Sequence, residues 1–234
     1  MMWCMKSRKP MCAECPYISC YHGDLDKLPD GCTMKAFEEA LREAETLYGR
    51  EDVKRLYEAS SRVEKNAYTS EDGEFRPTKP RILELIEFCS EMGFRRIGLA
   101  FCVGLKREAE EVAKLLRRAG FEVCSVMCKC GALDKSRLVG EDSKLRKGVF
   151  EAACNPVGQA AVLNEAGTDV NVIMGLCVGH DMLFTMFSRA PVTTLVVKDR
   201  VLGHSPLLAV YSRYIRGWVE RHANRLRTLK SGGS

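Results

Sequence analysis

Apolar residues recur at two different spacings along this chain, and the change of spacing divides it into two parts. Between residues 33 and 93 they follow a helical period, in three segments that end near Gly49, Lys65 and Gly93. From Arg96 onward, short apolar runs alternate with amphipathic stretches, as in βαβ units. Because the runs are apolar throughout, they predict parallel strands inside a sheet that helices cover on both faces.

The predicted strands and helices of the second part follow one another in regular alternation. The expected strands are 96–101, 121–127, 170–176 and 192–198, and the expected helices are 106–119, 156–166, 179–188 and about 206–229. We therefore predict a doubly wound α/β fold with a mostly parallel sheet of about four or five strands.

The segment before residue 33 differs from both parts. It contains cysteines, prolines and glycines but no periodic apolar pattern, so it needs a cross-link or a metal in order to fold. We accordingly expect a cysteine-rich metal-binding knuckle at 1–32, a helical segment packed on the core at 33–93, a Rossmann-like α/β domain at 94–229, and a flexible tail at 230–234.

The composition is that of an ordinary globular protein, with 46% hydrophobic and 29% charged residues and a formal net charge of +5 over 234 residues. Basic and acidic residues are interspersed, so we expect a solvated mixed surface and no nucleic-acid partner. No apolar run reaches the roughly 18 residues that span a bilayer, and residues 1–10 lack the apolar core of a signal peptide. We therefore expect a cytoplasmic protein with no membrane partner, and the sequence leaves its oligomeric state open.

Cysteine is the residue type that sets this chain apart, because it occurs 12 times. Disulfide scaffolds are short and rich in loops, whereas long helical and strand patterns dominate here. In a reducing cytosol, thiols in such numbers serve more often as metal ligands or catalytic groups. We therefore predict metal or cluster binding rather than disulfides.

The first set of cysteines lies in the N-terminal segment, with the spacing Cys12-x2-Cys15-x4-Cys20-x11-Cys32 and with Cys4 upstream. The two-residue gap lets two thiolates face one metal, and two further cysteines complete a tetrahedral zinc site or a cubane iron–sulfur cluster. We name Cys12, Cys15, Cys20 and Cys32 the knuckle thiols. Two interpretations stay open: a zinc knuckle that folds the segment, and an electron-transfer cluster.

The second set becomes visible once the strands are placed. Cys102, Cys128 and Cys177 follow three predicted strands, and Cys154 stands just before the helix that begins at Pro156. Ligands of an open parallel sheet bind beyond the carboxyl ends of its strands, so we expect these four residues, the strand-end thiols, to converge in one crevice. Helix N-termini there lower thiol pKa values and stabilise an anionic cluster. The alternative is that each is a small buried apolar residue.

The stretch Gly175-Leu176-Cys177-Val178-Gly179 indicates a different chemistry, nucleophilic catalysis. It matches a nucleophile elbow with Cys177 in place of serine, and His180 or His204 would be its base. These three residues are therefore candidate catalytic residues.

A basic turn follows the last predicted strand. Its residues Lys198 and Arg200 would lie on the same rim as the strand-end thiols, where a cation pair can hold an anionic substrate. An ordinary solvated charged turn is the alternative.

Short cysteine motifs are spread over nearly the whole chain. They include Cys12-Ala13-Glu14-Cys15, Phe101-Cys102-Val103-Gly104-Leu105, Cys128-Lys129, Cys154-Asn155-Pro156-Val157-Gly158-Gln159-Ala160 and Gly175-Leu176-Cys177-Val178-Gly179-His180-Asp181. Together they resemble an uncharacterised cysteine-rich family of prokaryotic proteins, common in anaerobes and labelled only as metal-binding. The resemblance implies metal binding and no established reaction. Cys130 departs from the pattern, which leaves the choice between Cys128 and Cys130 as ligand open.

The leading hypothesis is a metal-binding protein with two sites, whose status as an enzyme stays open. The knuckle thiols would hold a structural metal or cluster, and the strand-end thiols an iron–sulfur cluster of the [4Fe–4S] type or zinc. An open iron position would accept a small anionic or sulfur-containing substrate or serve a redox partner, which suits sulfur transfer or redox chemistry. The alternatives are a zinc or soft-metal handling or sensing protein without turnover, and a cysteine hydrolase that uses Cys177.

Overall fold

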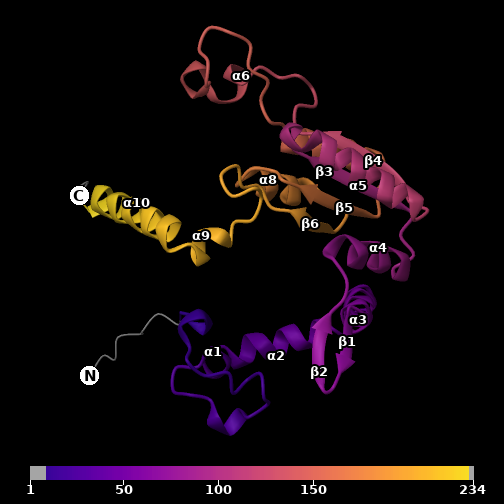
Figure 1. Ribbon diagram of the computed structural model, residues 1–234, viewed down its shortest axis with the longest axis vertical. Helices are drawn as coiled ribbons and strands as arrows, with labels where there is room; N and C mark the ends of the chain where they lie inside the picture. Colours follow the sequence, from indigo (N-terminus) through magenta and orange to yellow (C-terminus); the bar gives the residue numbers. More distant parts are fainter. Residues whose placement is uncertain (1–8, 232–234) are drawn as a thin grey trace. The chain divides into compact units, whose positions relative to one another are not determined.

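The computed structural model describes residues 9–231, so Cys4 and the end of the expected tail, 232–234, lie outside the described residues. The chain falls into two compact units, Met1–Asn66 and Ala67–Ser234. Figure 1 shows both units, with labels on most of their helices and strands.

The first unit is helical after its cysteine-rich segment. No residue from 9 to 50 is buried, which agrees with a segment that has no apolar core of its own. The helix expected to begin at Thr33 is interrupted at Phe37, whose φ of −125° leaves the helical region. Its elements are two 3₁₀ turns, Cys12–Glu14 and Leu25–Lys27, and the helices α1 (Thr33–Ala36), α2 (Glu38–Leu47) and α3 (Glu51–Asn66).

The second unit opens with a β-hairpin that the sequence pattern did not predict. Strands β1 (Tyr68–Glu71) and β2 (Glu74–Pro77) pair antiparallel around Asp72 and Gly73, which have φ values of 52° and 79°. An Asp-Gly pair is a strong hairpin signal, because both turn residues need positive φ. Every residue of the two strands is exposed, so no alternation of apolar and polar side chains marks them.

The sheet of the second unit is parallel and has four strands, as predicted. They are β3 (Arg96–Phe101), β4 (Glu122–Met127), β5 (Val170–Met174) and β6 (Val192–Val196), in the order β4-β3-β5-β6. Phe101 pairs with Met127 on one side and with Met174 on the other. The residues that follow β3, β4 and β5 therefore emerge at one level of the sheet.

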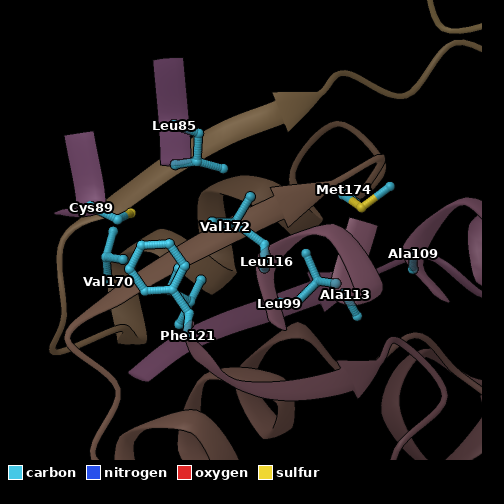
Figure 2. Packing of buried hydrophobic residues seen from close by; sticks show 11 residues of the cluster. Leu85, Cys89, Leu99, Ala109, Ala113, Leu116, Phe121, Val170, Val172 and Met174 are labelled. Atoms are coloured by element: carbon cyan, nitrogen blue, oxygen red, sulfur yellow. The ribbon is translucent and has the colours of Figure 1, made fainter. Parts of the chain in front are cut away.

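Helices cover both faces of this sheet, which confirms the doubly wound prediction. Side chains of β3 alternate, so that Ile97 and Leu99 enter one core cluster and Ala100 enters the other. Helices α4 (Arg81–Glu91) and α5 (Lys106–Arg118) pack on the first cluster, and Figure 2 shows their side chains meeting those of β5. Helices α7 (Pro156–Glu165) and α8 (His180–Phe187) contribute buried side chains to the second core cluster.

The order of the strands reverses direction between β3 and β5. The chain leaves β3 through α5 and reaches β4 on one side, then crosses through α7 on the other face to β5 on the opposite side. Ligands of doubly wound proteins bind at the carboxyl ends of the strands beside such a switch point. The fold therefore singles out the residues that follow β3 and β5.

The remaining elements connect or follow the sheet. The loop between β4 and α7 closes on itself, because Asp134 and Ala152 form an antiparallel bridge at its base. Lys144 is nearly buried in this loop and pairs with Asp134 at 2.8 Å. The other elements of this unit are 3₁₀ turns at Val103–Leu105 and Glu141–Ser143, the short helices α6 (Ser136–Val139) and α9 (Leu208–Tyr211), and the long helix α10 (Arg213–Ser231). Within residues 9–231, no helix is both long and apolar enough to cross a membrane.

Candidate functional site

Two of the strand-end thiols are placed by the sheet itself. The backbone N–H of Cys102 donates to the carbonyl of Met174 at 3.1 Å, and that of Cys128 donates to the carbonyl of Phe101 at 2.9 Å. These bonds extend the ladder one residue beyond β3 and β4, so both cysteines are fixed at the carboxyl edge. Both are buried.

Cys154 joins them from the far end of the loop between β4 and α7. The N–H of Asn155 donates to the carbonyl of Cys128 at 2.7 Å, which brings the two chain segments together. The Sγ atoms of Cys128 and Cys154 then lie 3.9 Å apart. Two sulfurs bound at about 2.3 Å to one tetrahedral ion lie about 3.8 Å apart. These two residues, which we name the thiol pair, are therefore spaced as two ligands of a single metal ion.

Each of the four strand-end thiols accepts a hydrogen bond from a nitrogen. The donors are the Val103 N–H to Cys128 at 3.3 Å, Lys129 Nζ to Cys154 at 3.4 Å, Lys198 Nζ to Cys102 at 3.3 Å, and an Arg200 guanidinium nitrogen to Cys177 at 2.9 Å. Three of these donors are cationic, so they favour thiolates and any anionic group that thiolates bind.

The electrostatics of the thiol pair separate its two members. The pKa of Cys154 falls to about 5, because its sulfur shares a hydrogen bond with that of Cys128 and because Lys129 and His180 add positive charge nearby. The pKa of Cys128 rises far above its ordinary value, because of the same hydrogen bond and because of burial. The pair therefore favours a state in which its two sulfurs share one proton, and Cys154 is the member whose pKa is lowered.

Cys102 belongs to the same neighbourhood. Its charge is one of the influences that raise the pKa of Cys128. Lys198 reaches its sulfur across Gly104, where an added Cβ would lie 3.4 Å from the lysine Nζ and 4.0 Å from the cysteine Sγ. A larger side chain in place of Gly104 would therefore crowd this contact.

Two amide side chains hydrogen-bond to the backbone segments that carry the strand-end thiols, and the sequence pattern did not identify them. Gln159 is fully buried, and its Nε2 donates to the carbonyls of Phe101 at 3.3 Å and Val126 at 2.7 Å, near the ends of β3 and β4. Asn155 caps α7 by accepting from the Gly158 N–H at 2.8 Å. Both lie in the Cys154–Ala160 motif, where a buried amide gives no periodic signal.

The candidate catalytic residues of the hydrolase hypothesis do not contact one another through their side chains. The Nδ1 of His204 accepts from the Asp199 N–H at 3.0 Å, and His180 meets Cys177 through a backbone bond from its N–H to the Cys177 carbonyl at 2.9 Å. Among the described residues, neither imidazole is hydrogen-bonded to the Cys177 sulfur, which Arg200 contacts instead. Cys177 also lacks the positive φ of a strained turn. The hydrolase stays a prediction that these contacts do not support.

The remaining cysteines take other roles. Cys89 is buried in the first core cluster, where burial raises its pKa to about 12 (Figure 2). Cys124 packs against the second cluster. The thiol of Cys130 donates to the Asn155 carbonyl at 3.7 Å, so it is Cys128 that faces Cys154. None of the cysteines in residues 9–231 forms a disulfide.

Two comparisons with known proteins place the chain. Residues 32–195 match the family described as Protein of unknown function (DUF1847). An uncharacterized protein from Methanocaldococcus jannaschii is 44% identical over 204 residues, which cover 87% of this chain and 94% of the relative. The chain belongs to the DUF1847 family. This membership confirms the resemblance to an uncharacterised family, and neither comparison names a metal, a cluster or a reaction.

The DUF1847 match covers the two predicted sites unequally. It includes all four strand-end thiols, whereas three of the knuckle thiols, Cys12, Cys15 and Cys20, precede it and the cations Lys198 and Arg200 follow it. The strand-end thiols are therefore the site that lies within the family's shared region.

Neither predicted metal site is gathered into a complete set of ligands. Within the part of this DUF1847 chain that the structure describes, no group of three or more His, Cys, Asp or Glu side chains is arranged to hold a metal ion. The Cys15 thiol donates to the Tyr17 carbonyl at 3.3 Å, and Cys12 and Cys20 are exposed. The knuckle site stays a prediction, and the strand-end site comes together as far as the thiol pair.

Proposed function

We propose that this DUF1847 protein binds a thiolate-ligated metal centre at the carboxyl edge of its sheet. Cys128 and Cys154 would be adjacent ligands, with Cys102 and Cys177 as the others. The observation that carries the proposal is the thiol pair, whose sulfurs lie 3.9 Å apart with Cys154 favoured as a thiolate. Completing a site with all four thiols requires Cys102 and Cys177 to move toward this pair when metal binds.

An iron–sulfur cluster is the centre we propose first. A cluster with several thiolate ligands is anionic, and hydrogen bonds and positive charge around its sulfurs tune its reduction potential. The donors from Lys129, Lys198 and Arg200 would supply that positive charge. Such a cluster supplies electron transfer or a binding position for a sulfur-containing group. Lys198 and Arg200 would also orient a small anionic substrate beside it.

A zinc or soft-metal handling protein without turnover is the second candidate, and a specific observation favours it. The 3.9 Å separation fits two ligands of one ion, whereas in a cubane cluster each cysteine ligates a different iron. Thiolate-rich sites also select soft ions such as copper(I) and zinc. The wild-type protein would then bind metal reversibly without a cluster absorption band.

Anaerobic purification followed by iron, zinc and sulfide analysis tests the proposal. We expect the wild-type protein to retain metal and the variant Cys154→Ser to lose the strand-end share of it. Cys130→Ser is the matched control, because that thiol lies in the same segment and contacts Asn155 instead of the pair. Iron with sulfide supports the cluster, and zinc alone supports the second candidate. Equal metal content in wild type and Cys154→Ser would refute the strand-end site.

Selective alkylation separates both metal candidates from the hydrolase. In metal-free protein at pH 6, Cys154 should react first, since its pKa is lowered to about 5. Preferential reaction at Cys177 would favour the hydrolase instead.

A further inference from the structure

Helix α10 (Arg213–Ser231) concentrates positive charge to an unusual degree. It carries six basic residues and one acidic residue, a balance of +5 that equals the formal net charge of the whole chain. The rest of the protein is therefore neutral overall, and the basic character lies in one helix outside the matched family region. Its basic residues are Arg213, Arg216, Arg221, Arg225, Arg227 and Lys230.

The same helix carries an apolar stripe that the described structure leaves uncovered. Ile215, Trp218, Val219, Leu226 and Leu229 recur at helical spacing on one side, and the basic residues flank them. No residue between Arg213 and Lys230, the part of α10 whose side chains the structure describes, is buried, and the exposed fractions of Trp218 and Leu229 are 55% and 74%. Such a stripe requires an apolar partner, because an exposed contiguous apolar surface is otherwise costly.

We propose that α10 binds an anionic lipid surface by lying in the plane of the interface. A helix with low overall hydrophobicity, a distinct apolar face containing tryptophan and leucine, and many basic residues has the composition of interfacial membrane helices. The apolar stripe enters the boundary between head groups and acyl chains, and the basic flanks meet the negative head groups. Tyr211 and Tyr214, exposed near the start of the helix, suit the same interface.

Other binding partners would complement either the basic residues or the apolar stripe of α10, but not both. Nucleic acid complements the basic residues but leaves Leu226 and Leu229 in water. A second copy of α10 would cover the apolar stripe but would bring two helices of +5 together. A negatively charged bilayer surface complements both features at once. This inference concerns lying on a bilayer and needs no spanning helix.

Vesicle flotation with the full chain tests the proposal. The probes are vesicles of phosphatidylcholine with and without about one-third phosphatidylglycerol, at low and high salt. We expect binding only to the anionic vesicles, weakened by salt because exposed charges are screened. The double variant Arg221→Gln/Arg225→Gln should bind roughly 30-fold more weakly, since each basic residue near an anionic surface contributes about fivefold. Trp218→Glu should abolish binding, and Leu145→Glu, at another exposed apolar residue, should leave it unchanged.

A second measurement guards against misfolded variants. In a Trp3→Phe background, the emission of Trp218 should shift to the blue on addition of anionic vesicles, because the ring leaves water. Equal binding to neutral vesicles, no binding to anionic ones, or wild-type binding by Trp218→Glu would overturn the proposal. Binding to duplex DNA that survives Trp218→Glu, or a dimer that this substitution dissociates, would assign α10 to nucleic acid or to a second copy and overturn it equally.

Discussion

The ionisation of the thiol pair gives the sharpest prediction, and it concerns the substitution Cys128→Ala in metal-free, reduced protein. The hydrogen bond between the sulfurs of Cys154 and Cys128 is the largest cause of the low pKa of Cys154, ahead of Lys129. Removing the Cys128 sulfur while Lys129 Nζ stays 3.4 Å from the Cys154 sulfur should raise that pKa by about one unit or more toward the ordinary thiol value of about 8.5.

The size of the effect follows from the two pKa values. At pH 6, a thiol with a pKa of about 5 is about nine-tenths ionised, whereas an ordinary thiol is less than about 1% ionised. The rate of alkylation at one pH understates this difference, because a thiolate of lower pKa is a weaker nucleophile. The midpoint of the pH profile avoids the problem, since it reports ionisation alone.

The assay is iodoacetamide alkylation from pH 4 to pH 9, with each cysteine followed by mass spectrometry. We expect reactivity of Cys154 to rise with pH around a midpoint near 5 in the wild type and at clearly higher pH in Cys128→Ala. Cys130→Ala is the control and should keep the wild-type midpoint, because its sulfur contacts Asn155. A wild-type midpoint near 8.5, or an unchanged midpoint in Cys128→Ala, would refute the reasoning.

Three further predictions follow from the same geometry. Zinc at 100 times its Kd should slow tryptic cleavage in the loop 131–150 by about 100-fold, since bound metal would stabilise the closed loop base against opening by about 2.7 kcal/mol. Cys154→Ser should remove the protection, and cleavage that zinc leaves unchanged in the wild type would contradict the prediction. Phe184→Ala should lower the free energy of unfolding in urea by about 3–5 kcal/mol, because this ring is fully buried, whereas Leu145→Ala should change it by less than about 0.5 kcal/mol. Gly175→Ala should weaken metal retention, because the φ of Gly175 is +64° and an added Cβ would clash with the Leu105 side chain and approach Lys198. Metal retention equal to that of the wild type would contradict this prediction.

The fold was predictable because the strands of the sheet are apolar on both sides. The runs that became β3 and β5 feed two core clusters, so they carry a strong pattern whichever way each side chain points. The hairpin of β1 and β2 was missed for the opposite reason, since all of its strand residues are exposed. The only local signal of this hairpin in the sequence is its Asp72-Gly73 turn, whose two residues have positive φ.

The knuckle thiols mark the limit of spacing arguments. Their intervals suit a metal, but no buried residue between 9 and 50 holds the segment in place, and within the described residues no three metal-ligating side chains are arranged to hold a metal ion. A segment whose fold depends on a ligand takes its arrangement from that ligand. Metal titration of the knuckle, followed by cysteine accessibility, is therefore the measurement that addresses this set.

The sequence by itself determined that Cys102, Cys128 and Cys177 follow parallel strands, because a strand ends where its apolar run ends and parallel strands end at one edge. Only the tertiary structure decided that Cys128 rather than Cys130 faces Cys154, that Lys129 and Arg200 contact thiols, and that Gln159 ties β3 to β4. Those contacts depend on side-chain direction and on segments far apart in the chain. The hydrophobic periodicity of a sequence indicates which residues are buried, but it does not determine which of them contact one another.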